Sequence, residues 1–302
     1  MRYFVAYPVS FDCDLHCSYC FHSNRHTTNY DGAQGDSADT AVQRRFTLED
    51  WCRFRDTHLA DAEDILVHFH GGETFLPSNA HTILTFMRHT KMERADLLTN
   101  GLQEEDSYRT IAEYAAQGRV SRVGFTFHRR VIGNVPELVE KFKRNASFVR
   151  GLGVPVYIKE LLFAGTRETL LAAKKIWDDL GFNYKIQDFK VGDSGRSFEE
   201  WRRYSAEDML AIDSEYKRGG DECACMRGYR NILIRGGWHD GDVLACFEDP
   251  TVVGSLQNNE YCRDYRVMKD FQAGRIDVQG VPKNYKGSYD RDVYVPAQCG
   301  SN

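Results

Sequence analysis

Hydrophobic and polar positions along the first two thirds of the chain follow two periods, one of about two residues and one of about 3.6. Short apolar runs rich in aromatic and β-branched residues predict strands at residues 3–9, 64–70, 95–98, 122–128, 154–162 and 184–190. Amphipathic segments predict a helix after each strand, the first opening at Thr47 and the others covering residues 80–91, 107–117, 136–150, 167–180 and 206–217. Six βα units in series predict an α/β fold with a parallel sheet, in the form of a partial (β/α)6, TIM-like barrel.

The first helix has a start signal in the sequence. Thr47 is a cap residue with Asp50 three positions later, a near relative of the capping box. Cys52 lies inside this helix, and we interpret it as a small buried hydrophobe rather than a ligand. Residues 21–45, which precede the helix, are polar and without periodicity, and they predict a long loop beside the proposed site, of a length that is usually functional or disordered.

The pattern changes after residue 217, which predicts a domain boundary between residues 1–217 and 218–302. Residues 229–234 and 242–245 predict two strands, and the glycine-containing segment 236–241 joins them as a β-hairpin. Cys225 precedes the first of these strands and Cys246 follows the second. We therefore expect the hairpin to bring two thiolates together at its open end.

Composition narrows the class of protein. The chain has 302 residues, of which 42% are hydrophobic, enough for a substantial core. Its net charge of −5 gives no basic surface for nucleic acid. The first ten residues contain one Arg and no long apolar run, and no segment approaches a membrane span, so we expect a cytoplasmic protein without a membrane segment. The nine cysteines are clustered, which favours metal binding over disulfides in that compartment.

Three cysteines follow the first predicted strand closely, with three and then two residues between them: Cys13, Cys17 and Cys20. Three thiolates on one short loop can hold three irons of a cubane cluster and leave the fourth iron open for a reactive ligand. A zinc loop is the alternative, because His16 or His22 could supply a fourth ligand.

The spacing, with an aromatic residue at Tyr19 before the last cysteine, resembles the signature of the radical S-adenosylmethionine (SAM) enzymes. In that family a Gly-Gly-Glu sequence after the second strand binds the amino group of SAM. Gly71, Gly72 and Glu73 follow the second predicted strand here, which disfavours the zinc loop. The resemblance implies a 4Fe–4S cluster, SAM as cosubstrate, and Tyr19 as a further cofactor contact.

Other strand ends resemble the same family. Thr99 and Asn100 end the third strand where relatives approach SAM, and Thr126 on the fourth strand matches a serine that contacts it. Lys159 on the fifth strand is a further expected cofactor contact. His128 departs from the family, which has an aspartate there, so it could contact substrate, act as a general acid or base, or be structural.

The C-terminal cysteines resemble the opening of the SPASM and twitch extensions of some radical SAM enzymes. Two fully ligated clusters need eight cysteines and this region has five, so one auxiliary 4Fe–4S cluster is expected, in a small hairpin-containing iron–sulfur extension. Cys225 and Cys246 are the firmest ligands, and Cys223 and Cys262 complete the set. Cys299 is a rival ligand or a catalytic hydrogen donor. A structural zinc hairpin is the alternative.

The resemblance implies reductive cleavage of SAM to a 5′-deoxyadenosyl radical, which abstracts hydrogen from a C–H bond of the substrate. We favour a peptide or protein substrate that is oxidised, cross-linked or epimerised, and a small-molecule dehydrogenase or rearrangement enzyme is the alternative. We see no extra N-terminal domain of the kind that many peptide maturases use to bind a leader peptide, which weakens the peptide hypothesis. A separate leader-peptide-binding protein is among the expected partners. Flavodoxin or ferredoxin is the expected electron donor. A non-catalytic iron–sulfur electron-transfer protein is a further alternative, which the Gly-Gly-Glu sequence disfavours.

Overall fold

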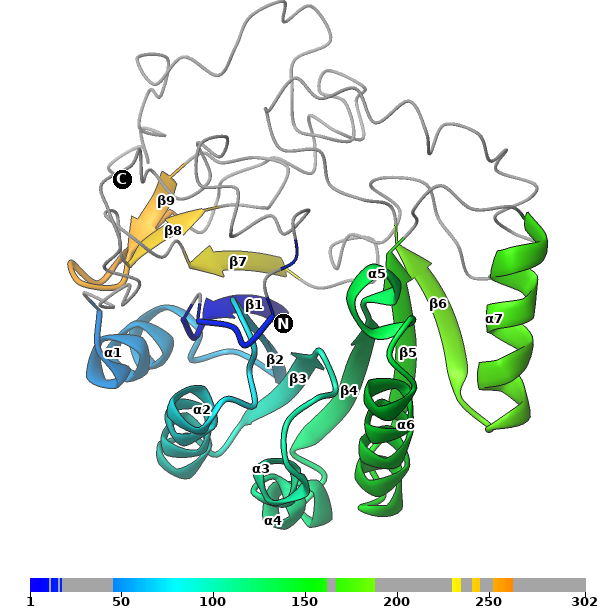
Figure 1. Cartoon of the computed structure of the whole chain (residues 1–302). Helices are drawn as coiled ribbons and strands as arrows, with labels where there is room; N and C mark the ends of the chain where they lie inside the picture. Colours follow the sequence, from blue (N-terminus) through cyan, green and yellow to red (C-terminus); the bar gives the residue numbers. More distant parts are fainter. Residues whose placement is uncertain are drawn as a thin grey trace, which may run out of the picture. The chain divides into compact units, whose positions relative to one another are not determined.

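The computed structural model describes residues 1–10, 12–15, 17, 46–161, 167–187, 230–234, 241–244 and 252–262 (Figure 1). Its helices are α1 (Leu48–His58), α2 (Pro77–His89), α3 (Glu105–Arg109), α4 (Ala112–Ala116), α5 (Arg129–Ile132), α6 (Pro136–Gly151) and α7 (Arg167–Asp179). Its strands are β1 (Arg2–Pro8), β2 (Asp64–His70), β3 (Glu93–Thr99), β4 (Val120–Phe127), β5 (Val156–Leu161), β6 (Asn183–Gln187), β7 (Arg230–Ile234), β8 (Asp242–Leu244), β9 (Val252–Ser255) and β10 (Glu260–Tyr261).

These elements form two compact units, which divide strand β2 between His68 and Phe69. The hydrogen-bonded strand order is β10-β9-β8-β7-β1-β2 in the first unit and β2-β3-β4-β5-β6 in the second. Among the described strands neither order closes on itself, so the sheet is open. The α/β class predicted from the sequence is confirmed, and the antiparallel strands of the first unit make the sheet mixed.

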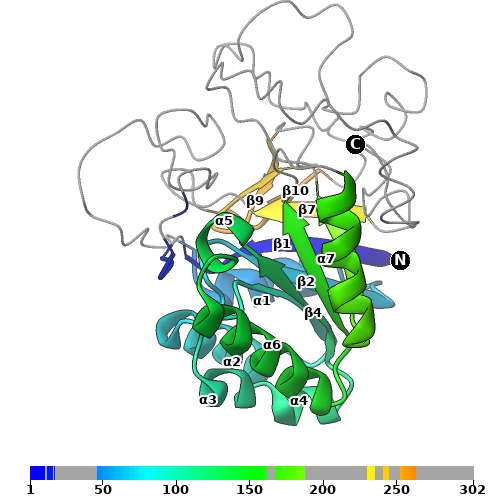
Figure 2. The same ribbon diagram turned by 45° about the vertical axis from the view of Figure 1, so that its right-hand side comes forward.

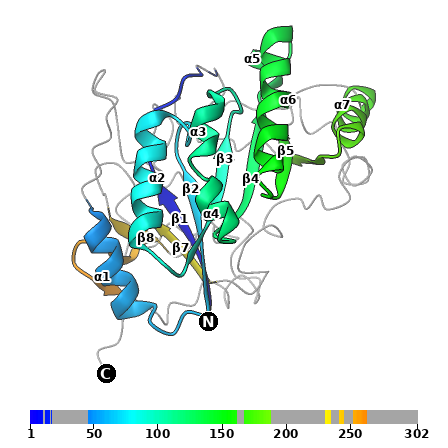
Figure 3. The same cartoon turned by 90° about the horizontal axis from the view of Figure 1, so that it is seen from below.

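The second unit is a parallel βα layer. Strands β3, β4, β5 and β6 pair in parallel. Figures 2 and 3 show helices α3, α4 and α6 gathered on one side of strands β3 to β5. Parallel strands end at one edge of the sheet, so the segments that follow β3 and β4 emerge on the same side.

Aromatic side chains fill the space between the helices and the second unit's strands. Phe125 and Phe127, on β4, are 0% and 5% exposed and contact Phe142 of α6 with ring centroids 5.6 and 5.2 Å apart. Trp177 of α7 closes the cluster against Phe127 at 5.4 Å. Every second residue at this end of β4 is therefore buried under the helices, as the period-two pattern of the sequence predicts.

The intervening residues of the same strands form a polar face. Arg122 of β4 pairs with Asp96 of β3 through two hydrogen bonds of 3.0 and 2.8 Å, and its guanidinium lies 5.4 Å from the ring centroid of Tyr157. Asp96 is only 1% exposed. A carboxylate this buried needs such a bidentate partner, because an unpaired charge would lose its hydration without compensation.

The first unit combines parallel and antiparallel pairing. Strand β1 pairs in parallel with β7, while β7–β8, β8–β9 and β9–β10 are antiparallel. Ala6, Leu233 and Leu244 form a small buried cluster across β1, β7 and β8. The predicted hairpin of residues 229–245 is present as β7 and β8, whereas its turn, residues 235–240, lies outside the described residues.

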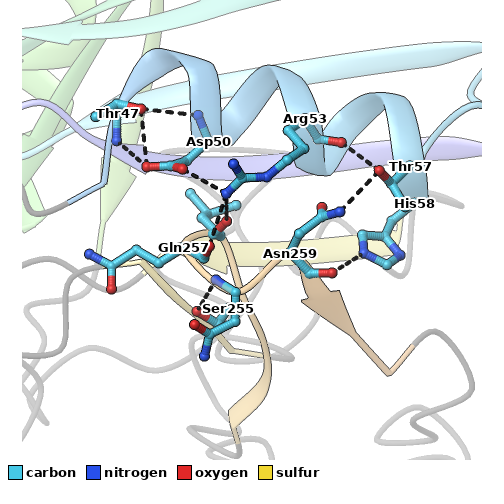
Figure 4. A network of polar contacts seen from close by, with 10 residues as sticks. Thr47, Asp50, Arg53, Thr57, His58, Ser255, Gln257 and Asn259 are labelled. Atoms are coloured by element: carbon cyan, nitrogen blue, oxygen red, sulfur yellow. Dashed lines mark hydrogen bonds and ion pairs between the residues drawn. The ribbon is translucent and has the colours of Figure 1, made fainter.

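Helix α1 holds the loop between β9 and β10 (Figure 4). The predicted cap at its start is a full capping box, in which the Thr47 hydroxyl accepts from the Asp50 N–H and the Asp50 carboxylate accepts from the Thr47 N–H. Arg53 donates to the carbonyls of Leu256 and Gln257, at 3.4 and 2.9 Å. These bonds join residues about 200 positions apart in the sequence.

Asn259 anchors the same loop from the other side. Its backbone is left-handed, with φ of 56°, its side-chain N–H₂ donates to the Thr57 hydroxyl at 3.1 Å, and its carbonyl lies 2.8 Å from Nε2 of His58. The Tyr261 ring packs against Phe54 of α1 at 5.4 Å. Helix α1 therefore fixes strand β10, which leads directly to Cys262.

Several element boundaries differ from the prediction. The single helix expected at residues 107–117 is two short helices, α3 and α4, because the Thr110 hydroxyl bonds the Ser107 carbonyl and competes with the helical pattern. Helix α2 begins earlier than predicted, at Pro77, a residue suited to the first helical position. Helix α5 and strands β9 and β10 were not predicted, and the helix expected at residues 206–217 lies outside the described residues. The helices that the structure describes include none long and apolar enough to cross a membrane.

Candidate functional site

The cysteine loop begins in the second unit after Val9 and Ser10. Cys13 and Cys17 are both reduced, and the backbone N–H of Leu15 donates to Sγ of Cys13 at 3.4 Å. Cys17 is 5% exposed. A reduced thiol with a backbone N–H donor is the kind of sulfur that ligates iron–sulfur clusters. Cys20 and Tyr19, the other expected residues of this loop, lie outside the described residues.

The Gly-Gly-Glu turn follows β2 and contacts the start of the cysteine loop. The N–H of Gly72 donates to the Ser10 carbonyl at 2.7 Å, and the N–H of Glu73 donates to the Asp12 carbonyl at 2.8 Å. Gly71 has φ of 136°, and a Cβ at this position would lie 1.9 Å from the Ser10 carbonyl oxygen. The approach of the two segments therefore requires glycine at position 71.

Glu73 is buried at 1% exposure, with its carboxylate turned into the protein. It accepts from the N–H of Phe75 at 2.8 Å, the Thr99 hydroxyl at 2.8 Å and the N–H of Asn100 at 2.6 Å. Burial raises the pKa of Glu73 to about 7, although these hydrogen bonds act to lower it. An ionised carboxylate has about four acceptor positions, so one position is left after these three donors.

Asn100 links the Gly-Gly-Glu turn to the cysteine loop. While its backbone N–H donates to Glu73, its side-chain N–H₂ donates to the carboxylate of Asp14 at 2.6 Å. Gln103 donates to the other oxygen of Asp14 at 2.8 Å. The expected contacts Thr99 and Asn100 thus lie against Glu73, and Asn100 reaches the residue beside Cys13.

His128 lies against the cysteine loop at the end of β4. Its Nδ1 is 3.8 Å from Sγ of Cys17. Burial, reinforced by the positive charge of Lys159 and opposed by Asp14, lowers the pKa of His128 to about 4. The imidazole is therefore neutral near pH 7 and can present one N–H and one bare nitrogen.

Thr126 and Lys159, two further expected cofactor contacts, are in register on β4 and β5. Both are partly buried and lie on the polar face of these strands. Glu160, the next residue, lies on the opposite face, where it is 1% exposed and binds Arg129 and the Tyr184 hydroxyl. Of the two adjacent charged residues of β5, Lys159 is therefore the one on the same face as Thr126.

Four residues that contribute to this site were not predicted from the sequence: Ser10, Asp14, Asn79 and Gln103. The Ser10 hydroxyl donates to Asn79 at 2.8 Å, and the side-chain N–H₂ of Asn79 donates to the Glu73 carbonyl at 2.7 Å. Asn79 is 3% exposed, inside helix α2. A buried asparagine on an amphipathic helix was the available signal, since such an amide needs partners.

Most of the expected ligands of the auxiliary cluster fall outside the part of the chain that the structure describes. Cys223, Cys225, Cys246 and Cys299 lie outside the described residues. Cys262 follows β10 and is disulfide-bonded. Cys52 is reduced and partly buried on α1.

In the described part of the chain no three His, Cys, Asp or Glu side chains converge closely enough to hold a metal ion. The two cysteines of the motif that the structure describes nevertheless fit an iron–sulfur cluster. Cys13 and Cys17 are reduced and lie on one short loop, beside a backbone N–H donor. The third sulfur of the motif, Cys20, lies outside that part of the chain.

No family model and no curated protein matches this sequence. Solved structures do match its fold. Tagged anSMEcpe with bound AdoMet matches with a TM-score of 0.53 at 15% identity, over 84% of this chain and 74% of that chain. SuiB of Streptococcus suis bound to S-adenosylmethionine matches with a TM-score of 0.50 at 14% identity, over 82% of this chain and 60% of that chain.

Native anSMEcpe with bound AdoMet and the Cp18Cys peptide also matches, with a TM-score of 0.50 at 16% identity, over 85% of this chain and 77% of that chain. The chain shares the fold of these SAM-bound structures. This agrees with the predicted TIM-like α/β architecture, while the iron–sulfur extension stays a prediction.

Proposed function

We propose that this protein is a radical SAM enzyme that abstracts hydrogen from a C–H bond of a peptide substrate. One observation carries the proposal. The cysteine loop, the Gly-Gly-Glu turn and the end of β3 are hydrogen-bonded into one site, in a fold shared with SAM-bound structures. A passive electron carrier has no need of a turn built to receive an ammonium group.

Each part of the site has a role in the proposal. Cys13, Cys17 and Cys20 hold a 4Fe–4S cluster, and Tyr19, Thr126 and Lys159 contact SAM. When bound, the cluster and SAM supply a 5′-deoxyadenosyl radical by reductive cleavage of SAM. The Gly71–Gly72 backbone and the remaining acceptor position of Glu73 bind the SAM amino group. Ionisation of Glu73, whose pKa is about 7, is favoured by that ammonium partner.

The proposed substrate is a peptide or protein that is oxidised, cross-linked or epimerised. Its support is the match to anSMEcpe bound to AdoMet and the Cp18Cys peptide. A small-molecule dehydrogenase or rearrangement enzyme is the second candidate. Flavodoxin or ferredoxin as electron donor, a cytoplasmic site of action and a separate leader-peptide-binding protein belong to the same proposal.

The proposal includes one auxiliary 4Fe–4S cluster in residues 218–302, next to a radical SAM core of residues 1–217. Its ligands are Cys223, Cys225, Cys246 and Cys262, and Cys299 is a rival ligand or a hydrogen donor. The pairing of β7 with β8 supports the predicted hairpin, which precedes Cys246 in the sequence. Cys262 must be a thiolate to bind iron, so its disulfide has to be reduced before reconstitution.

Anaerobic reconstitution, followed by iron and sulfide counting and an assay for 5′-deoxyadenosine, tests the proposal. A content of about eight irons per chain would support two cubane clusters, and a content of about four would exclude the auxiliary cluster. Changing Cys13, Cys17 and Cys20 to Ala should abolish SAM cleavage. A reconstituted protein that keeps its cluster and does not cleave SAM with a strong reductant would be an electron-transfer protein instead.

A further inference from the structure

We propose that Asp14 is a positioning residue that fixes the cysteine loop relative to the Gly-Gly-Glu turn, so that SAM can reach the cluster and the turn together. The inference rests on the proposed function. Asp14 is adjacent to Cys13, and its two carboxylate oxygens accept separately from Asn100 at 2.6 Å and Gln103 at 2.8 Å. Both donors belong to the segment that follows β3.

The contacts of Asp14 differ from those at the base of the loop. Gly72 and Glu73 bond the carbonyls of Ser10 and Asp12, which precede the first cysteine. Asp14 ties down the part of the loop that lies beyond Cys13, and it does so through side chains rather than backbone. Its two bonds therefore control the orientation of the segment between the first two ligands.

Asn100 connects Asp14 directly to Glu73, the proposed binding site of the SAM ammonium group. It is 4% exposed and lies between two carboxylates, with its backbone N–H on Glu73 and its side-chain N–H₂ on Asp14. Its own Oδ1 accepts from the N–H of Leu102 at 3.0 Å, which fixes the direction of the amide. A shift of Asp14 would leave a buried donor unsatisfied, so the loop and the turn keep a defined separation.

The charge of Asp14 adds a second consequence. Its Oδ1 is 3.9 Å from Sγ of Cys13, which donates to it as a thiol. A Cys13 sulfur that ligates iron no longer donates to Asp14. Asn100 and Gln103 then keep the carboxylate bonded. A fixed negative charge beside a ligand sulfur lowers the reduction potential of a cluster.

Asp14→Asn tests the inference, with Asp12→Asn as the matched control. Asparagine offers one acceptor oxygen and turns an N–H₂ group toward an amide donor, so it loses at least one bond as well as the charge. Asp12 lies in the same loop, and among the described residues its carboxylate accepts no hydrogen bond. Each reconstituted variant is titrated with SAM by calorimetry, and its cluster potential is measured by redox titration followed by electron paramagnetic resonance.

We expect Asp14→Asn to retain its iron, to bind SAM about 10- to 100-fold more weakly, and to show a higher midpoint potential. Asp12→Asn should match the wild type in iron content and in SAM affinity, because among the described residues its carboxylate holds no part of the loop. In the cluster-free protein, Asp14→Asn should also speed hydrogen exchange at the Leu15 amide, which bonds Cys13. Equal SAM affinity, potential and exchange in the two variants would overturn the inference.

Gln103→Ala is the second variant, for the case in which Asp14→Asn does not fold. It removes only the exposed bond to Asp14, and we expect a smaller loss of SAM affinity with an unchanged potential. Unchanged SAM affinity in Gln103→Ala, if Asp14→Asn is unfolded, would also overturn the inference. Failure of the wild-type protein to hold a cluster would instead reject the proposed function itself.

Discussion

Burial of Glu73 makes the stability of the protein depend on pH. Its pKa rises from an ordinary value of 4.5 to about 7, because the folded state removes the carboxylate from water. A group whose pKa is raised by folding contributes stability that is fully present below its unfolded pKa and is lost as the pH rises through its folded pKa. For Glu73 that window runs from about pH 4.5 to about pH 7.

We predict that wild-type protein without SAM loses up to about 3 kcal/mol of stability relative to Glu73→Gln between pH 4.5 and pH 8. Urea unfolding of both proteins across this range measures the difference. His128 has the opposite sign, because its lowered pKa favours the folded state at higher pH, but it is present in both proteins and cancels. A pH-independent difference between the two proteins would contradict the burial of an ionisable carboxylate at this position.

Gly71→Ala is predicted to destabilise the protein by about 2–5 kcal/mol, because the new Cβ meets a backbone oxygen at 1.9 Å and the backbone has a positive φ. The matched control is Gly151→Ala at the end of α6, where a Cβ meets nothing within 4 Å. That change should alter stability by less than about 1 kcal/mol. Thermal unfolding of both variants measures the contrast, and equal losses would refute the close approach to Ser10.

At the scale of elements, helix α1 is attached to the β9–β10 loop mainly by hydrogen bonds from its side chains to backbone carbonyls of the loop (Figure 4). Strand β10 has only two residues, so its own ladder is short. The Cys262 N–H donates to the Val253 carbonyl at 2.6 Å at the end of that ladder. The position of Cys262 therefore depends on α1 as well as on the strand.

Arg53→Ala should weaken the attachment of the β9–β10 loop to helix α1 without unfolding the protein. Arg53 is half exposed, and its two carbonyl bonds together contribute about 1 kcal/mol. We predict several-fold faster hydrogen exchange at the amides of residues 256–262, with the parallel strands β3 to β6 unaffected. Arg88→Ala, an exposed change near the end of α2, is the control. Unchanged exchange at the Leu256 and Cys262 amides would show that the strand pairing alone positions the loop.

At the scale of the whole molecule, the proposed two-cluster enzyme predicts different iron contents for two cysteine variants. Cys262→Ala, reconstituted after reduction, should lose about four of about eight irons and keep part of its SAM cleavage, because the N-terminal site is intact. Cys52→Ala should keep all its iron, since Cys52 lies on helix α1 and belongs to neither predicted set of cluster ligands. If Cys262→Ala keeps all of its iron, Cys299 would be the fourth ligand of the auxiliary cluster in place of Cys262.

The sequence by itself predicted most of the described helices and strands, the start of helix α1 at Thr47 and Asp50, and three residues that the structure brings together, Glu73, Thr99 and Asn100. These features depend on periodicity and on neighbours a few positions apart, and the ends of parallel strands necessarily share one edge. The same reasoning missed the break between α3 and α4, where the Thr110 hydroxyl competes for a helical carbonyl.

Only the tertiary structure decided which distant residues meet. It paired β7 with β1, turned the Glu73 carboxylate inward onto Thr99 and Asn100, and brought Asp14 to Asn100, which is 86 positions away. Hydrophobic periodicity fixes which face of an element is buried, but it carries no information about the partner on that face. The sequence therefore determined the elements and the candidate chemistry of this protein, and long-range packing decided the hydrogen bonds that join them into one site.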